Sequence, residues 1–201
     1  MISSNSQSKV AQFRQPTYEI DPVFVNRWSP RSFSEKEVPE EVLLSLFEAA
    51  RWAPSAFNVQ PWRFIIARSQ EAREQFHSFI GEFNLTWCKK APAFALIISK
   101  VTSEHGDNRS HAFDTGAAWG SLSLEAVHKG LITHPMTGID FDKAREVLQI
   151  PDDYAINALV AIGYQGEKDA LPEALQQREQ PSPRRPLEES IFEGSFGQPL
   201  K

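Results

Sequence analysis

Residues 48–62 of this 201-residue chain read EAARWAPSAFNVQPW and join a predicted helix to a predicted strand. The helix begins at Pro39, because proline suits the first turn, and its apolar side chains recur at helical spacing until Pro54 ends the pattern. A strand with an apolar centre is predicted over residues 61–68. The junction therefore places a short loop at the edge of a sheet.

The loop at this junction presents hydrogen-bonding side chains at Ser55, Asn58 and Gln60. A flat heteroaromatic ring with carbonyl and imide groups needs such donors and acceptors at its rim. The alternative is a helix stop followed by an asparagine turn. The two interpretations stay open when this segment is taken alone.

Helical and extended patterns alternate outward from this junction. Further helices are predicted over residues 21–31, 69–83, 111–130 and 141–148, strands over residues 93–100 and 155–163, and a polar loop over residues 102–108. The strand at 93–100 is apolar throughout, so we expect it at the centre of a sheet. The helix at 111–130 is apolar around much of its circumference, which favours burial at the domain centre or at a subunit interface. The pattern indicates an α+β or α/β fold.

The composition is that of an ordinary globular domain, with 41% hydrophobic and 23% charged residues. We expect an N-terminal arm at 1–20, a main domain at 21–168, and a proline-rich extension at 169–201 that is disordered or wraps another surface. A net charge of −5 gives no reason to expect a nucleic-acid partner. No stretch approaches the roughly 20 apolar residues of a membrane span. The single cysteine, Cys88, is interpreted as a small buried residue, and a cytoplasmic location is expected.

Two basic segments are candidates for binding an anion. Arg27 and Arg31 flank Ser29 near a predicted helix end, and guanidinium groups bind phosphate in a bidentate way. Arg184 and Arg185, in the extension, are placed to close on a phosphate from far away in the sequence. The alternatives are a solvated basic turn and a solvated charged linker.

The segment at 134–140 follows the longest predicted helix and contains Gly138. A backbone N–H beside a glycine can approach a ligand closely, and the alternative is a plain loop turn. The histidines lack the spacing of metal ligands, so no metal site is expected; they are His111, His128 and His134.

Taken together and in this order, these segments resemble the nitroreductase family of FMN-dependent oxidoreductases, from about Phe24 to about Phe192. The resemblance is strongest over 48–62 and includes the helix at 114–118 and the segment from Gly130 to Gly138. It implies an α+β fold with a central, mostly antiparallel sheet flanked by helices, and a long central helix in an intertwined homodimer. It also implies that the extension wraps the partner subunit, and that FMN lies between subunits and passes electrons from NADH or NADPH to a small acceptor in a ping-pong cycle.

The resemblance further implies which residues contact the FMN. The residues around Arg27 flank the phosphate and ribityl chain, the loop after Pro54 comes from the other subunit, and a backbone N–H near Gly138 faces flavin N5. No catalytic side chain is expected, because the flavin carries the chemistry. The implied FMN-binding residues are Arg27, Trp28, Ser29, Arg31, Pro54, Ser55, Ala56, Asn58, Asn84, Met136, Thr137, Gly138, Arg184 and Arg185, with Gln60 behind them.

One departure from the family pattern is Trp87, which stands where many members carry a lysine near the flavin; Lys89 and Lys90 are the nearby cations. The acceptor is expected to be a nitroaromatic compound or a quinone. The alternatives are a dehalogenase, an enone or aldehyde reductase on the same scaffold, and a non-enzymatic flavin carrier. The choice between NADH and NADPH stays open.

Overall fold

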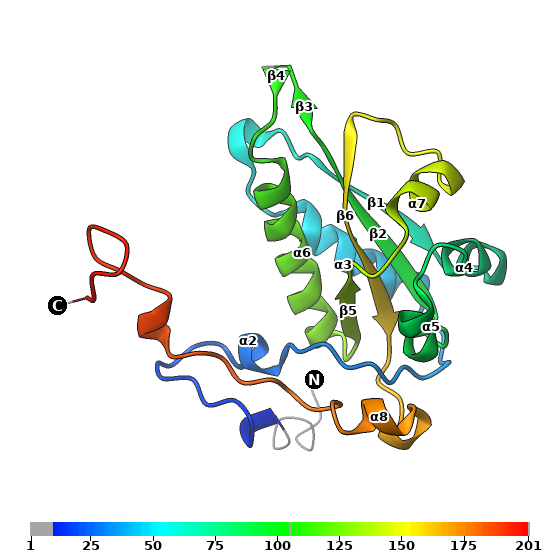
Figure 1. Cartoon of the computed structure of the whole chain (residues 1–201), viewed down its shortest axis with the longest axis horizontal. Coiled ribbons are helices and arrows are strands. Elements are labelled where there is room, and N and C mark those ends of the chain that lie inside the picture. Colours follow the sequence, from blue (N-terminus) through cyan, green and yellow to red (C-terminus); the bar gives the residue numbers. More distant parts are fainter. Residues whose placement is uncertain (1–9, 105, 201) are drawn as a thin grey trace.

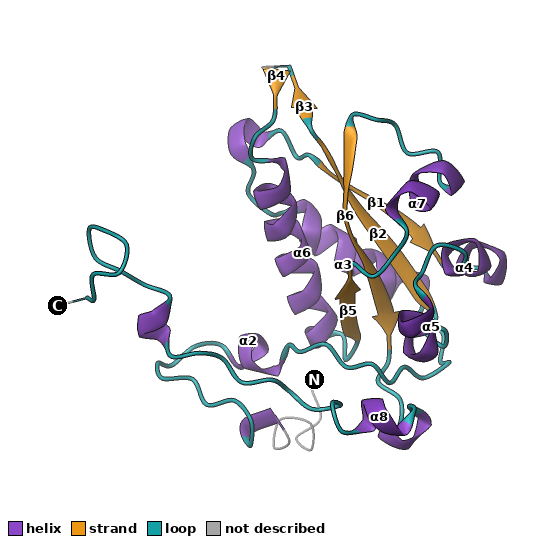
Figure 2. Ribbon diagram, viewed as in Figure 1, coloured by secondary structure: helices purple, strands orange, loops and turns teal. Residues whose placement is uncertain are grey.

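The computed structural model describes residues 10–104 and 106–200. Within this part of the chain, a four-stranded antiparallel sheet forms the centre, in the order β1-β2-β6-β5 (Figure 1). The strands are β1 (Trp62–Ala67), β2 (Ala93–Lys100), β5 (Ile132–Met136) and β6 (Tyr154–Gly163). Helices cover both faces of the sheet (Figure 2), so the α+β class and the antiparallel sheet are confirmed.

One face of the sheet is covered by α3 (Glu40–Arg51) and by α6 (His111–His128), the longest helix described. Leu46 of α3 and Leu122 of α6 are fully buried in the core beneath these helices. Burial of one such leucine stabilises the fold by roughly 1.5–3 kcal/mol. The prediction of a long helix at the domain centre is therefore confirmed, although Phe113 on its outer side is 85% exposed.

The other face carries α4 (Gln70–His77), α5 (Glu82–Cys88) and α7 (Phe141–Val147). Phe76, Phe79 and Phe94 form a fully buried aromatic group between these helices and the sheet. Cys88 is also fully buried there, as predicted, and burial raises the pKa of its thiol to about 12. The strand β2 is buried along nearly its whole length between β1 and β6, which confirms its central place.

The predicted single helix over 69–83 is wrong, because the structure divides it into α4 and α5. The chain turns between them, where the Gly81 N–H donates to the Gly138 carbonyl oxygen at 3.0 Å and Ile80 forms a bridge with Ile139. A pairing with a distant segment thus interrupts a locally favourable helical pattern.

Two short extended segments were not predicted. The strand β5 contains Pro135, which suits an edge strand that pairs on one side only, here with β6. The expected loop at 102–108 contains a minimal hairpin of β3 (Thr102–Ser103) and β4 (Gly106–Asp107). The first helix is also shorter than expected: α2 spans Pro22–Asn26 and is capped by the Asp21 carboxylate.

The chain after β6 forms η2 (Lys168–Ala170) and α8 (Glu173–Gln176), which lie below the end of β6 in the view of Figure 1. Leu171 and Leu175 of this segment join the core of their own chain. Beyond η3 (Leu187–Glu189) the extension leads away from the body (Figure 1), and Phe196 is 92% exposed. Residues 1–9 of the expected N-terminal arm lie outside the described residues. No helix in the described ranges is long and apolar enough to cross a membrane.

Candidate functional site

Three arginines from distant parts of the sequence form a basic cluster beside α2, and they are Arg14, Arg27 and Arg184. Burial lowers the pKa of Arg27, and the charge of Arg184 lowers it further. The same two effects, together with the charge of Arg27, lower the pKa of Arg14 to about 10. None of the three forms an ion pair with a described carboxylate. Such a group of mutually repelling guanidinium ions is suited to bind a phosphate.

Arg14 holds the basic cluster together through backbone oxygens. Its guanidinium Nη1 donates to the carbonyl oxygens of Val25 at 2.9 Å and of Arg27 at 2.7 Å. Its Nε donates to the Ser182 carbonyl oxygen in the extension, at 2.9 Å. Sequence reasoning missed Arg14, because a lone arginine in a polar arm carries no local signal.

The extension contributes Arg184 to the cluster, where its charge acts on both Arg14 and Arg27. Its own Nη1 donates to Ser182 Oγ at 3.1 Å and to the Pro183 carbonyl oxygen at 3.0 Å. Arg185, the other tail arginine proposed from the sequence, is exposed next to it. The cluster therefore favours Arg184 as the tail cation.

Arg31 is held near this cluster through its backbone. The buried carboxylate of Glu179 accepts hydrogen bonds from the Arg31 N–H at 2.8 Å and from the Ser32 N–H at 2.9 Å. Ser32 Oγ also donates to the Glu167 carbonyl oxygen at 2.5 Å. The extension thus anchors the segment that carries Arg31, and sequence reasoning missed Glu179 because its partners lie about 150 positions away.

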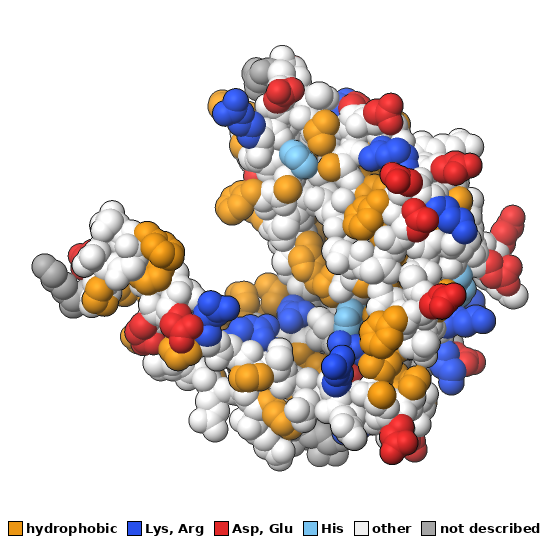
Figure 3. All heavy atoms as spheres, viewed as in Figure 1, with side chains coloured by type: hydrophobic (Ala, Val, Ile, Leu, Met, Phe, Trp, Pro, Cys, Tyr) orange, Lys and Arg blue, Asp and Glu red, His pale blue; other side chains and the backbone are white. Residues whose placement is uncertain are grey.

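A groove of about 460 Å³ opens directly beside the cluster. Arg27 and Ser29 contribute polar groups to it, and Arg27 Nη1 donates to Ser29 Oγ at 3.3 Å. The remaining wall is mostly apolar; the lining residues are Phe24, Arg27, Ser29, Trp119, Gly120, Ser123, Leu124 and Pro135. Figure 3 shows Lys and Arg side chains along a hollow between the body and the extended tail. Trp28, which stands between Arg27 and Ser29 in the sequence, is half-buried.

The end of β5 forms a second part of the candidate site. Met136 is buried in the core, whereas Thr137 and Gly138 are exposed just after the strand. Among the described residues, neither of these two backbone N–H groups donates to a backbone or side-chain atom. Asn84 Nδ2 donates to the Gly138 carbonyl oxygen at 3.0 Å. The structure therefore brings the predicted Asn84 and Gly138 into direct contact.

Trp87 supports Asn84 from the core and does not present a charge to the site. Its Nε1 donates to Asn84 Oδ1 at 3.3 Å, and its ring lies between those of Phe33 and His134. Of the nearby cations, Lys90 faces Glu35 at 4.0 Å, and the charge of Lys89 lowers the pKa of His77, after the larger effect of burial.

The polar loop of 54–60 contains the short helix η1 (Ala56–Asn58) and is exposed. Phe57, Asn58 and Gln60 all have positive φ, at 52°, 57° and 50°. Residues other than glycine rarely adopt positive φ, and backbone strain of this kind is often found in functional loops. Ser55 Oγ accepts from the Gln60 N–H at 3.0 Å, which closes the loop on itself.

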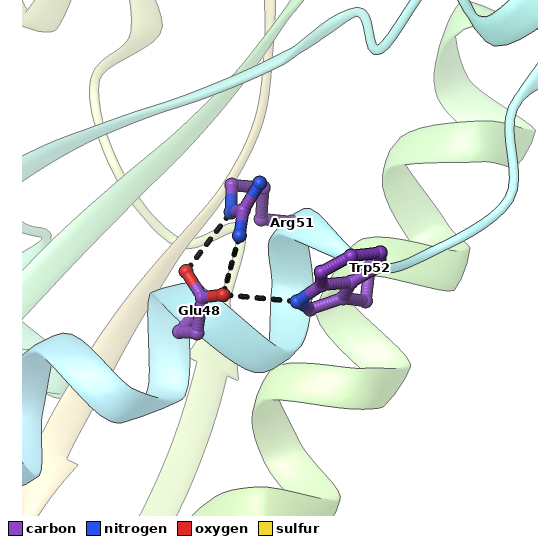
Figure 4. A network of polar contacts seen from close by, with 3 residues as sticks. All are labelled: Glu48, Arg51 and Trp52. Atoms are coloured by element: carbon purple, nitrogen blue, oxygen red, sulfur yellow. Dashed lines mark hydrogen bonds and ion pairs between the residues drawn. The ribbon is translucent and has the colours of Figure 1, made fainter.

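Asp114 ties this loop to α6, and Glu48 stabilises the end of the helix that precedes the loop. The buried Asp114 carboxylate, in the first turn of α6, accepts from the Ala56 N–H at 3.1 Å. At the end of α3, Glu48 accepts from Arg51 and from Trp52 Nε1, as Figure 4 shows. These hydrogen bonds, that to Arg51 first, lower the pKa of Glu48 to about 2. The C-terminal end of α3 is therefore stabilised by side-chain hydrogen bonds, and the exposed Pro54 follows it.

A single chain does not bring the two halves of the predicted site together. The loop is tied to Asp114 near the start of α6, whereas the groove lies along Trp119 and Leu124, further down the same helix. With a rise of 1.5 Å per residue, Trp119 lies about 8 Å and Leu124 about 15 Å further along the helix axis than Asp114. The loop after α3 and α2 accordingly lie towards opposite ends of α6 (Figure 1).

Comparison with known proteins identifies the family. A crystal structure described as an oxidoreductase containing FMN is 43% identical, has a TM-score of 0.88, and is matched over 92% of this chain and 96% of its own. An NADH dehydrogenase of Thermus thermophilus is 26% identical, over 88% of this chain and 97% of its own length. An iodotyrosine deiodinase of Thermotoga neapolitana is 25% identical, over 69% of this chain and 84% of its own length. The model of the Nitroreductase family matches residues 25–86 and 79–164, and this chain belongs to that family.

Proposed function

We propose that this protein is an FMN-dependent oxidoreductase that uses NADH or NADPH to reduce small acceptors. The observation that carries the proposal is the basic cluster of Arg14, Arg27 and Arg184 at the edge of the groove. A dianionic phosphate relieves the repulsion among these cations, and the apolar wall suits the rest of a flavin nucleotide. Family membership and the FMN named for the similar crystal structure support the same cofactor.

The residues present fit such a cofactor in their chemistry. Arg27 and Ser29 would hold the phosphate and ribityl chain, and Arg184 would add the tail cation. The N–H groups of Thr137 and Gly138, with the Asn84 amide beside them, would hydrogen-bond to the ring. When bound, FMN supplies the capacity to accept a hydride from the nicotinamide and to pass electrons to the acceptor. The protein would bind and orient the cofactor, and one oriented hydrogen-bond donor contributes on the order of 1–3 kcal/mol to cofactor or transition-state stabilisation.

The proposal includes a homodimer in which each site uses two chains. Within one chain, the loop with Ser55, Ala56 and Asn58 lies towards the opposite end of α6 from α2, so a second copy would supply it. Around the loop, Phe57 is 86% and Phe113 85% exposed, and exposed apolar side chains grouped in this way are typical of an interface. The exposed extension from 187 onward would wrap the partner in the same assembly.

The test is FMN titration followed by anaerobic reduction. Purified protein stripped of bound flavin is titrated with FMN, and its mass is measured by light scattering with and without FMN. We expect saturation at one FMN per chain, a dimeric mass, and bleaching of the yellow colour by NADH or NADPH. Failure to take up FMN would contradict the cofactor, and a monomer that binds FMN tightly would contradict the shared site.

The acceptor class needs its own experiment. Nitroaromatic compounds and quinones are proposed, and the deiodinase among the relatives favours including halogenated aromatic compounds as rivals. Stopped-flow reoxidation of the reduced protein by nitro, quinone, enone, aldehyde and halogenated compounds ranks the classes. Uniformly slow reoxidation by the whole panel, with slow reduction by both nucleotides, would instead indicate a flavin carrier. A cytoplasmic location stays a prediction, to be tested by cell fractionation.

A further inference from the structure

The N-terminal arm takes part in the basic cluster, although it lies before residue 25, where the family match begins. Arg14 is half-buried and joins two separate places: the end of α2, through Val25 and Arg27, and the extension, through Ser182. These hydrogen bonds measure 2.7–2.9 Å and come from one charged group, so each is of the stronger kind. The arm and the extension therefore meet at one side chain.

This arrangement has an electrostatic cost that a bound anion would offset. Arg14 lies close enough to Arg27 and Arg184 for their charges to lower its pKa. If the three carbonyl oxygens alone were its purpose, a neutral donor would serve without repelling two neighbouring cations. A bound dianion reverses the sign of that interaction, because all three cations then attract the same group.

We propose that Arg14 is a positioning residue of the phosphate site. It holds the Arg27 backbone and the Ser182 backbone in place, so that the Arg27 and Arg184 guanidinium groups stay close together despite their repulsion, and it adds a third positive charge. The inference rests on the proposed binding of FMN, and it extends the site to a residue in the N-terminal arm.

The experiment compares two flavins that differ only in the phosphate. Dissociation constants for FMN and riboflavin are measured by fluorescence quenching on flavin-free wild-type protein and on Arg14→Ala. We expect Arg14→Ala to weaken FMN binding about tenfold and riboflavin binding less than about threefold. Arg14→Lys, which keeps the positive charge but lacks the planar set of guanidinium donors, should recover part of the FMN affinity.

Arg145→Ala is the matched control. Arg145 likewise crosslinks backbone oxygens, those of Ile150, Pro151 and Tyr154, but belongs to α7 on the other side of the sheet. It should lower stability while leaving the ratio of the two dissociation constants unchanged. If Arg14→Ala does not fold, Arg14→Gln, which keeps a neutral NH₂ donor group, is measured instead with the same expected ratio.

Two outcomes overturn the inference. One is FMN binding by the Arg14 variants that equals wild type, and the other is an equal loss for FMN and riboflavin, which would mean that Arg14 only supports the fold. A wild-type protein that binds neither flavin would contradict the proposed function itself. That result is distinct, because it appears before any variant is compared.

Discussion

The rings of Trp87 and His134 lie with their centroids 4.4 Å apart, and this contact joins the core beneath Asn84 to the segment that carries Arg31. His134 Nδ1 lies 2.9 Å from the Pro30 carbonyl oxygen, which places the N–H of the neutral ring at that atom. Burial lowers the pKa of His134 to about 4, more than its hydrogen bonds raise it, and the charges of Arg31 and Arg27 lower it further. His134 is therefore neutral in the folded protein at neutral pH.

The free energy of unfolding should decrease as the pH falls from about 6.5 to about 4. In that window an unfolded His134 binds a proton and the folded one does not, so the contribution is present above pH 6.5 and lost below it. The loss amounts to at most roughly 3 kcal/mol. Denaturant titrations at several pH values should show a shallower dependence in His134→Gln. His128→Gln, at an exposed position, should keep the wild-type slope, and parallel curves for His134→Gln and wild type would refute this assignment.

Arg27→Ala should weaken FMN binding more than Arg109→Ala. Arg27 borders the groove and belongs to the basic cluster, whereas Arg109 is exposed in the turn before α6. Loss of a charge-assisted contact with phosphate is expected to reduce affinity by about tenfold or more. Fluorescence titration with FMN measures both variants, and equal affinities would mean that the phosphate lies elsewhere.

Gly138→Ala should displace the Asn84 side chain. A Cβ at position 138 would come within 2.5 Å of Asn84 Nδ2, so the amide must leave the Gly138 carbonyl oxygen or the turn must move. We expect weaker FMN binding and a loss of stability of roughly 1–3 kcal/mol. Thr137→Ala, one residue earlier in the same exposed turn, keeps the backbone N–H proposed to meet the flavin, so as the control it should change both quantities little. Calorimetry and FMN titration decide the matter, and a Gly138→Ala protein that matches the control would count against the contact.

Glu179→Gln should loosen the extension from the body. The buried carboxylate accepts from the N–H groups of Arg31 and Ser32, and an amide offers one acceptor oxygen in place of two. The free energy of unfolding is expected to fall by about 1–3 kcal/mol, with faster proteolysis after residue 165. Glu173→Gln, at an exposed site in α8, should leave both unchanged. Unaltered stability and proteolysis in Glu179→Gln would show that other contacts hold the extension.

The predicted site residues divide into those that a local pattern singled out and those that needed the fold or the family resemblance. The segment around Arg27 and the turn at Gly138 were found from charge and glycine placement, and the structure places each beside the groove or the Asn84 side chain. The sequence alone did not show that Asn84 contacts Gly138, or that His134 contacts Pro30 beside the segment of Arg27. Asn84 carried no local signal apart from the family resemblance, and its orientation depends on Trp87.

The sequence by itself determined the elements whose formation depends on neighbouring residues. The apolar run at 93–100 and the helical spacing at 111–130 specify a buried strand and a long helix, because each pattern matches the period of one backbone geometry. Only the tertiary structure decided the break between α4 and α5, the edge strand β5, and the long-range contacts of Arg14 and Glu179. Arg14 meets Ser182 across 168 positions and Glu179 meets Arg31 across 148, and such contacts follow from the path of the whole chain rather than from any local period.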